Sequence, residues 1–288
     1  ALQMIDFACG GDEDTLYLVH EGLQLWLAVV RNAPSYTEDL HALFPRITAL
    51  GAEALAGDEV QSLPTALLVI EAYAYLGAQH VLESYAVEIA RYMELQLNGV
   101  TLNGAQYLIR ILEAFLLSCP EAATGFLVQS GVLNTLVSIC VASALGHTDE
   151  PPVQIAMYMS VLAKVLLVDP SQLNHICEAM VASGQASSMD HALGVLFDIF
   201  LDKFDSLGYA ASGPYRRRLW VVSWLSLYPT DNRALLERFP AVLIAVDSVY
   251  AEQVSEGGQE RLQSLNRLLV AESTSLFILA CCVLIPAC

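Results

Sequence analysis

The side chains that could bind a metal or carry out catalysis are scattered along this chain. His175 and Cys177 lie two residues apart in a stretch that predicts a short helix, so they face different sides and do not share a metal. Cys281, Cys282 and Cys288 near the C-terminus have no histidines at zinc-site spacing. The acids of GGDEDTL (10–16) do not continue to the twelfth-position glutamate of a calcium loop, and they suit a helix cap better. We expect no metal and no cofactor.

Motifs that mark enzymes are also missing from the sequence. It holds no GxxxxGK[ST] phosphate loop, no GxGxxG after a strand, no GxSxG and no HExxH. We therefore expect no catalytic residues and a protein that is not an enzyme.

Charge is the strongest chemical signal in the composition. The chain has 31 acids against 13 bases, a net charge of −18. Such a surface repels nucleic acid and anionic membranes and attracts basic partners. No apolar run reaches the ~18–20 residues that a membrane helix needs. We expect basic protein partners, with neither nucleic acid nor membrane among them.

One basic run interrupts this acidic sequence. Arg216, Arg217 and Arg218 either dock an acidic segment or form ion pairs with acids of the preceding helix, such as Asp202 and Asp205. We favour the ion pairs.

The tryptophans and cysteines lie in strongly apolar segments. Trp26, Trp220 and Trp224 sit at the centres of such segments, where core packing is favoured over a surface pocket for an aromatic peptide. The seven cysteines have irregular spacing. This pattern indicates buried, reduced thiols rather than a disulfide framework.

A recurring joint organises the chain: an apolar helix ends, a proline or glycine breaks it, and an amphipathic helix restarts. It occurs at Pro34, Pro120, Pro170 and Pro229, and Gly77 lies midway in the longest interval. Six residues after each proline the residue is apolar, namely Leu40, Phe126, Ile176 and Leu235. A period of roughly 40–60 residues with two helices per unit predicts an all-α, HEAT-type α-solenoid of antiparallel helix pairs, an armadillo-like superhelix. The 55% hydrophobic content and mean hydropathy of +0.50 agree with tightly packed pairs.

The apolar periodicity predicts the following helices. The first is capped by Asp12 or Asp14 and covers 16–33; the second starts with a Ser35–Glu38 capping box and is kinked or ended by Pro45. Pro64 opens the third predicted helix, which covers 65–76. The other predicted helices cover 81–97, 105–118, a long stretch over 126–145, 154–168, 172–183, 191–207, 215–227, and 232–254 with a bend at Pro240.

Four stretches also carry a family resemblance: HEGLQLWLAVVRNAPSYTEDLHALF (20–44), ESYAVEIARYMELQ (83–96), MYMSVLAKVLLVDPSQLNHICEAM (157–180) and RRRLWVVSWLSLYPTDNRALLERF (216–239). In order and spacing they resemble the C-terminal half of the importin-11-like β-karyopherins, which belong to the importin-β family. The resemblance spans most of residues 10–255. It implies a HEAT-repeat nuclear transport receptor that carries cargo through the nuclear pore under control of the Ran GTPase, in cytoplasm and nucleus.

The resemblance also implies partners and limits. Phenylalanine-glycine nucleoporins and Ran would be partners, Ran mainly through an N-terminal half that the chain lacks. The chain starts at Ala1 without a cap-like segment, so we interpret 1–255 as a solenoid fragment of a longer receptor. Residues 256–288 form a linker and an apolar end, LFILACCVLIPAC, where the family tends to be charged and polar. We interpret 277–288 as an altered terminus or a gene-model error.

Two functions from different classes follow. The first is a cargo-binding segment of a transport receptor; the alternative is a HEAT-repeat scaffold of a stable complex without transport activity. In such solenoids one helix of each pair lines the concave face, where acids attract basic cargo. Glu38, Asp39, Glu83 and Glu88 are the expected cargo-binding residues, because they lie on the second helices of the first two pairs.

Overall fold

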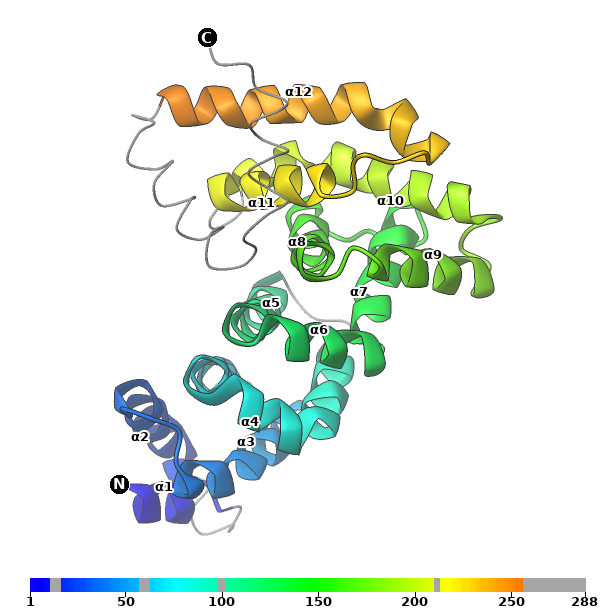
Figure 1. Cartoon of the computed structure of the whole chain (residues 1–288). Helices are drawn as coiled ribbons and strands as arrows, with labels where there is room; N and C mark the ends of the chain where they lie inside the picture. Colours follow the sequence, from blue (N-terminus) through cyan, green and yellow to red (C-terminus); the bar gives the residue numbers. More distant parts are fainter. Residues whose placement is uncertain (11–16, 57–62, 98–101, 210–212, 256–288) are drawn as a thin grey trace. The chain divides into compact units, whose positions relative to one another are not determined.

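The computed structural model describes residues 1–10, 17–56, 63–97, 102–209 and 213–255 (Figure 1). Within these ranges the chain forms α-helices and short 3₁₀ helices, with no β-strand. The predicted all-α solenoid of helix pairs is confirmed. The predicted cap at Asp12 or Asp14, the linker at 256–259, the apolar terminus and its three cysteines lie outside the described residues.

The chain divides into two compact units, Ala1–Val168 and Asp169–Cys288. The helices of the first unit are α1 (Leu2–Ala8), α2 (Val19–Asn32), α3 (Glu38–Ala56), α4 (Leu63–Leu97), α5 (Leu102–Ser118), α6 (Pro120–Gln129), α7 (Val132–Ala144) and α8 (Pro152–Val168). The second unit contains α9 (Gln172–Ala182), α10 (Met189–Lys203), the 3₁₀ helix η2 (Asp205–Tyr209), α11 (Gly213–Leu225) and α12 (Arg233–Ser255).

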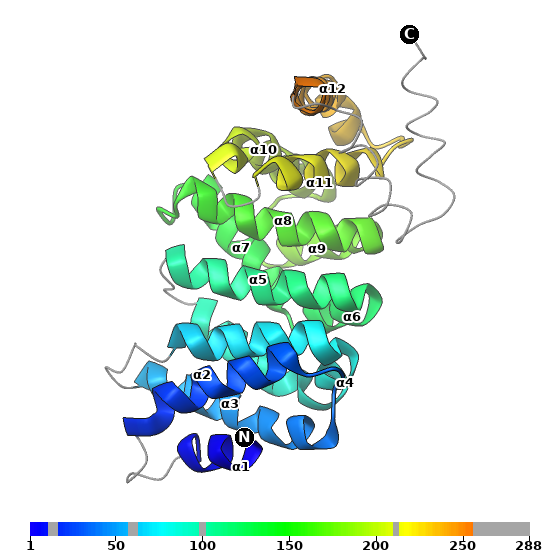
Figure 2. The ribbon, with the colours of Figure 1, turned by 90° about the vertical axis from the view of Figure 1, so that its left-hand side faces the viewer.

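The first unit is built of two layers of helices. Figure 2 shows α2, α4, α5 and α8 as successive rungs, and each packs on the next. The second helices of the pairs form the other layer, in which α3 packs on α4 and α6 on α7. The long α4 serves both layers, because its helical geometry breaks at Gly77 and Tyr85. The break at Gly77 was predicted from the sequence.

Prolines and buried apolar residues explain where the pairs begin. Pro120 and Pro152 are the first residues of α6 and α8, and Pro64 lies in the first turn of α4, where a missing N–H costs nothing. The four apolar residues that follow the proline joints are all buried: Leu40, Phe126, Ile176 and Leu235. Each joint therefore turns the chain and returns an apolar face to the core.

Several local predictions need correction. The long helix over 126–145 is two helices, because Gly131 has a φ of 80° between α6 and α7, a conformation that ends the first helix. The cap of α3 is Thr37, whose Oγ1 accepts the Leu40 N–H at 3.4 Å, rather than a Ser35–Glu38 box. Pro45 does not end its helix, since α3 continues through it. The helix predicted over 232–254 is a single helix, α12, with Pro240 inside it, as expected. The short α1 was not predicted.

Aromatic side chains fill the core of the second unit. Trp220 and Trp224 are fully buried and lie against Phe200, with ring centroids 4.9 and 5.7 Å from it. Phe204 adds a further contact to Trp224 at 5.5 Å. Trp26 of the first unit is also fully buried. The core-packing interpretation of the three tryptophans is thus confirmed.

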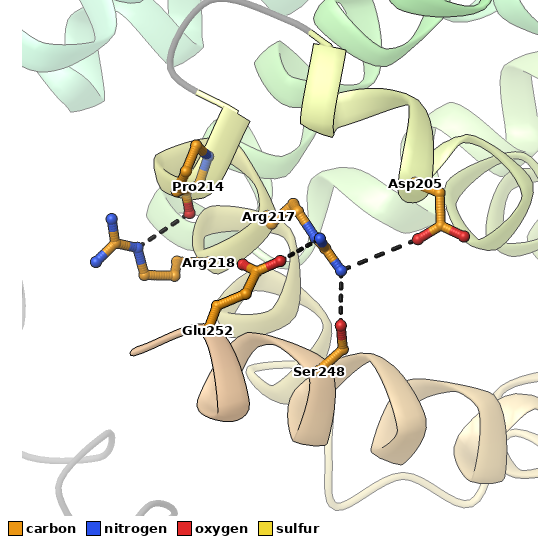
Figure 3. A network of polar contacts seen from close by, with 6 residues as sticks. All are labelled: Asp205, Pro214, Arg217, Arg218, Ser248 and Glu252. Atoms are coloured by element: carbon orange, nitrogen blue, oxygen red, sulfur yellow. Dashed lines mark hydrogen bonds and ion pairs between the residues drawn. The ribbon is translucent and has the colours of Figure 1, made fainter. Parts of the chain in front are cut away.

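The arginine run ties α11 to its neighbours, as Figure 3 shows. Arg217 pairs with Glu252 of α12, donates to Ser248 Oγ at 2.7 Å, and lies 3.9 Å from Asp205. Its guanidinium also sits 4.5 Å above the Phe204 ring. Pairing with Asp205 was predicted, whereas Asp202 pairs with Lys203 instead. Arg217 therefore acts within the fold, as the ion-pair interpretation predicted, and Arg218 donates to the Pro214 carbonyl of its own helix at 3.0 Å.

The described cysteines match the sequence prediction in part. Cys9, Cys119, Cys140 and Cys177 are all free thiols, but Cys119 is half-buried whereas the other three are buried. Burial raises the pKa of Cys9 and of Cys177 to about 11, so both stay protonated at neutral pH.

No single helix in the described ranges is long and apolar enough to cross a membrane. The bent pair α6–α7 meets that requirement by length and composition alone.

Candidate functional site

The four acids predicted from the sequence all lie on the second-helix layer of the first unit. Glu38 and Asp39 form the first turn of α3, and Glu83 and Glu88 follow the Gly77 break in α4. All four are exposed, and α3 packs on α4. We call them the acidic surface. These exposed acids do not interfere with the packing of α3 on α4. The buried positions next to them are occupied by the apolar residues Leu40 and Ile89.

Local contacts distinguish the four acids. Glu83 accepts a hydrogen bond of 2.7 Å from the Gln79 side chain one turn earlier. Glu38 and Asp39 lie at the N-terminus of a helix, where the macrodipole favours negative charge. Glu38 and Glu88 act electrostatically on two tyrosines, Tyr36 and Tyr85, which belong to one cluster.

That cluster, made of Tyr36, His41, His80 and Tyr85, joins α3 to α4 and was missed by the sequence reasoning. The Tyr36 ring stacks on His80 with centroids 5.3 Å apart, and the His41 ring lies 4.9 Å from that of Tyr85. The Tyr36 hydroxyl lies 3.0 Å from His41 Nδ1, and the Tyr85 hydroxyl donates to the His41 carbonyl at 2.9 Å. His80 is exposed and the other three are half-buried, so the cluster reaches the surface.

Burial sets the protonation of the two tyrosines. It raises the pKa of Tyr36 to about 12, with smaller contributions from Tyr85 and the negative charge of Glu38. Burial and then Glu88 raise the pKa of Tyr85. Both hydroxyls therefore remain neutral donors at physiological pH, and the negative charge of this surface comes from the carboxylates.

A glycine allows the cluster to form. A Cβ at Gly77 would lie 2.3 Å from Tyr36 Cδ2 and 2.6 Å from Cγ. The ring of Tyr36 can therefore cover the break in α4 only because residue 77 has no side chain. Gly77 was recognised in the sequence as a helix breaker, but its contact partner was not.

A hollow lies on the other layer, between α2, α4 and α5. It has a volume of about 490 Å³, and Val30, Arg31, Leu68, Tyr75 and Leu76 contribute to its walls. At its edge Arg110 of α5 donates to both carboxylate oxygens of Glu71, at distances of 2.8–3.1 Å. Glu71 is 7% exposed, so this pair neutralises a buried charge and fastens α5 to α4.

Neither surface offers a centre for metal chemistry. In the described part of the chain no three His, Cys, Asp or Glu side chains gather as metal ligands. His175 lies 3.6 Å from Glu178, one turn along α9, and Cys177 is buried. What the acidic surface can do is attract and hold positively charged groups, with aromatic faces beside them.

Comparison with known proteins places these helices in a family. The sequence model of a family described as "Importin-11-like, TPR repeats" matches residues 1–275. Importin-11 of Mus musculus and Importin-11 of Homo sapiens are each 25% identical to the chain over 236 residues. That region is 82% of this chain and 22% of each relative, so the chain spans about a fifth of the length of the curated relatives it matches. On the strength of the match over 1–275, the chain belongs to the importin-11-like family of karyopherins.

Proposed function

We propose that the chain is a cargo-binding segment of a nuclear transport receptor, and that its acidic surface receives basic protein cargo. The observation that carries this proposal is the placement of Glu38, Asp39, Glu83 and Glu88, all exposed on the two packed helices α3 and α4. Two of these acids flank a cluster whose aromatic faces suit arginine and lysine side chains. The chain's net charge of −18 adds long-range attraction for such cargo.

The remaining parts of the proposal rest on the family. Passage through the nuclear pore depends on Ran, which binds mainly to other repeats of the longer receptor, and on phenylalanine-glycine nucleoporins. The receptor moves between cytoplasm and nucleus. The segment needs no cofactor and catalyses no reaction. Its binding to cargo is weak in isolation, because a solenoid gains affinity by wrapping its partner and the segment offers a short stretch of that surface.

The test is binding of a fluorescein-labelled peptide rich in lysine and arginine to the 288-residue chain. In the variant with Glu83→Lys and Glu88→Lys, we expect Kd at low salt to rise by about threefold to tenfold, mainly through slower association. The matched control carries Glu21→Lys and Asp149→Lys, two exposed acids outside α3 and α4 that give the same change of charge. It should bind within about twofold of the parent chain.

The two variants separate a local site from general attraction. Equal weakening in both would mean that net charge alone holds the peptide, and it would remove the acidic surface as a site. Equal binding of both variants and the parent at all salt concentrations would overturn the proposal. Cargo that stays bound to the longer receptor when GTP-loaded Ran is added would favour the alternative, a scaffold of a stable complex.

A further inference from the structure

The hollow between α2, α4 and α5 brings two arginines together in an acidic protein. Arg31 lies in the last turn of α2 and Arg110 in α5, and both line the hollow together with Glu71 of α4. The whole chain has 31 acids against 13 bases, so an excess of positive charge at one place contrasts with the rest of the sequence. We call this place the arginine hollow. It attracts negative charge locally.

The Arg110 guanidinium is held in position, yet its donors are not all in use. Its Nε and Nη2 atoms donate to the carboxylate of the buried Glu71 at 2.8–3.1 Å, and its Cζ lies 6.0 Å from the centroid of the Tyr107 ring. A guanidinium carries five N–H donors. Nη1 donates to no residue that the structure describes, and the side chain is 49% exposed. The pair with Glu71 therefore orients Arg110 and leaves Nη1 available to a second acceptor.

Arg31 adds a cation that no acid neutralises. It is exposed, and no acid in the described ranges forms an ion pair with it. Glu71 is the one acid among the described residues that line the hollow, and Arg110 already neutralises its charge. Glu113 acts electrostatically on Tyr75 but does not line the hollow. The net effect is a site with a positive charge to spare.

The walls of the arginine hollow are mostly apolar. Val30, Leu68 and Leu76 contribute aliphatic surface, and Tyr75 adds an aromatic ring that is 56% exposed. The volume of about 490 Å³ is enough to admit an apolar side chain from another molecule. Apolar walls with a few fixed polar groups are typical of a binding pocket.

We propose that the arginine hollow binds a short acidic peptide segment of a partner protein. Carboxylates of the segment pair with Arg31 and with Nη1 of Arg110, while an apolar side chain beside them packs on the wall formed by Val30 and Leu68. A long polyanion such as nucleic acid is disfavoured, because the net charge of −18 repels it over its whole length. A short segment carries few charges, so the two arginines dominate its interaction.

This inference does not depend on the cargo proposal. The hollow uses α2, α5 and the part of α4 before the Gly77 break, whereas the acidic surface lies on α3 and the part of α4 after it. The two sites also select opposite charges, so one can fail without the other.

The test is fluorescence anisotropy with a short fluorescein-labelled peptide of glutamates around a central Leu-Phe pair, added to the 288-residue chain at low salt. In the variant Arg31→Glu we expect Kd to rise by about fivefold to tenfold, because a carboxylate replaces one of the two cations. The matched control is Arg91→Glu, which makes the same change of charge at an exposed arginine of α4 outside the hollow. It should bind within about twofold of the parent chain. Circular dichroism shows whether both variants are folded.

Two further peptides make the test specific. With serines in place of the Leu-Phe pair, the acidic peptide should bind at least about threefold more weakly, because it lacks the apolar contact. The peptide rich in lysine and arginine should bind Arg31→Glu at least as tightly as it binds the parent chain, since the substitution adds negative charge.

Three outcomes would overturn the proposal. The first is that the parent chain does not bind the acidic peptide. The second is equal weakening in Arg31→Glu and Arg91→Glu, which would show that overall charge governs binding. The third is equal binding of the serine peptide, which would reduce the hollow to a site for any small anion.

Discussion

At the scale of single residues, Tyr73 connects three helices of the first unit. Its hydroxyl accepts a hydrogen bond from Trp26 Nε1 of α2 at 2.9 Å and donates one to the Leu40 carbonyl of α3, also at 2.9 Å. Its ring packs edge-on against Phe44 with centroids 5.0 Å apart. Both Tyr73 and Trp26 are fully buried. Such a group contributes most when all of its partners are satisfied.

Replacing Tyr73 with phenylalanine should therefore destabilise the protein. The change keeps the ring but leaves the buried Trp26 N–H without its acceptor, which costs about 1–3 kcal/mol. Urea unfolding followed by circular dichroism measures the effect. The control is Tyr75→Phe, two residues away and 56% exposed, which should change the free energy of unfolding by less than about 0.5 kcal/mol. Equal effects of the two substitutions would contradict the role given to Tyr73.

At the scale of elements, helix boundaries could be predicted only in part. Pro64 was recognised as lying in the first turn of its helix, where a missing N–H costs nothing. Pro120 and Pro152 have the same property, yet the helices that they begin were predicted to start only at residues 126 and 154. The split at Gly131 was missed because GVLNTLVSIC reads as continuous apolar periodicity, and only the φ of 80° ends the helix. Thr37 was passed over for Ser35 because both can cap, and only the start of α3 at Glu38 decides between them.

The break in α4 leads to a prediction about Gly77. Its φ of −158° is open to other residues, so the demand for glycine comes from the Tyr36 ring, 2.3 Å from where a Cβ would lie. Gly77→Ala should push Tyr36 off His80 and lower the free energy of unfolding by about 1–3 kcal/mol. Gly125→Ala in α6 is the control: its nearest neighbour is 4.0 Å away, so alanine should stabilise by about 0.5–1 kcal/mol.

A double-mutant cycle identifies the cause. If the clash with Tyr36 is what makes Gly77→Ala costly, the substitution should cost much less in a Tyr36→Ala background, where no ring is displaced. Strictly additive free energies of unfolding would show that the cost lies in the backbone of α4 instead.

At the scale of the whole molecule, the sequence predicted the class of fold and the charge but only part of the candidate site. The acids were recognisable because they fall off the apolar stripe of their helices. The cluster of Tyr36, His41, His80 and Tyr85 was not, because it is assembled from residues up to 49 positions apart by the packing of α3 on α4.

The net charge of −18 should also govern how salt affects stability. With 31 acids and 13 bases, like charges repel one another across the folded surface. At about 0.01 M salt the Debye length is ~30 Å, so this repulsion acts across much of a domain; at 0.15 M it falls to ~8 Å. We therefore expect Tm to rise between these two salt concentrations, while affinity for a basic peptide falls. Differential scanning calorimetry gives the first quantity and fluorescence anisotropy the second.

The two charge variants make this prediction specific. Each replacement of an acid by lysine changes the net charge by +2, so the Glu83→Lys, Glu88→Lys variant has a net charge of −14 in place of −18. The variant with lysine at positions 21 and 149 has the same net charge. Because the salt dependence of stability reflects repulsion summed over the surface, both variants should show the same rise in Tm, smaller than that of the parent chain. Their affinities for the basic peptide should nevertheless differ, since among the four substituted acids only Glu83 and Glu88 belong to the acidic surface. A fall in Tm with added salt would show that specific ion pairs such as Arg238–Asp198, at 2.6 Å, outweigh the general repulsion. A different salt response in the two variants would place the repulsion locally, in α3 and α4.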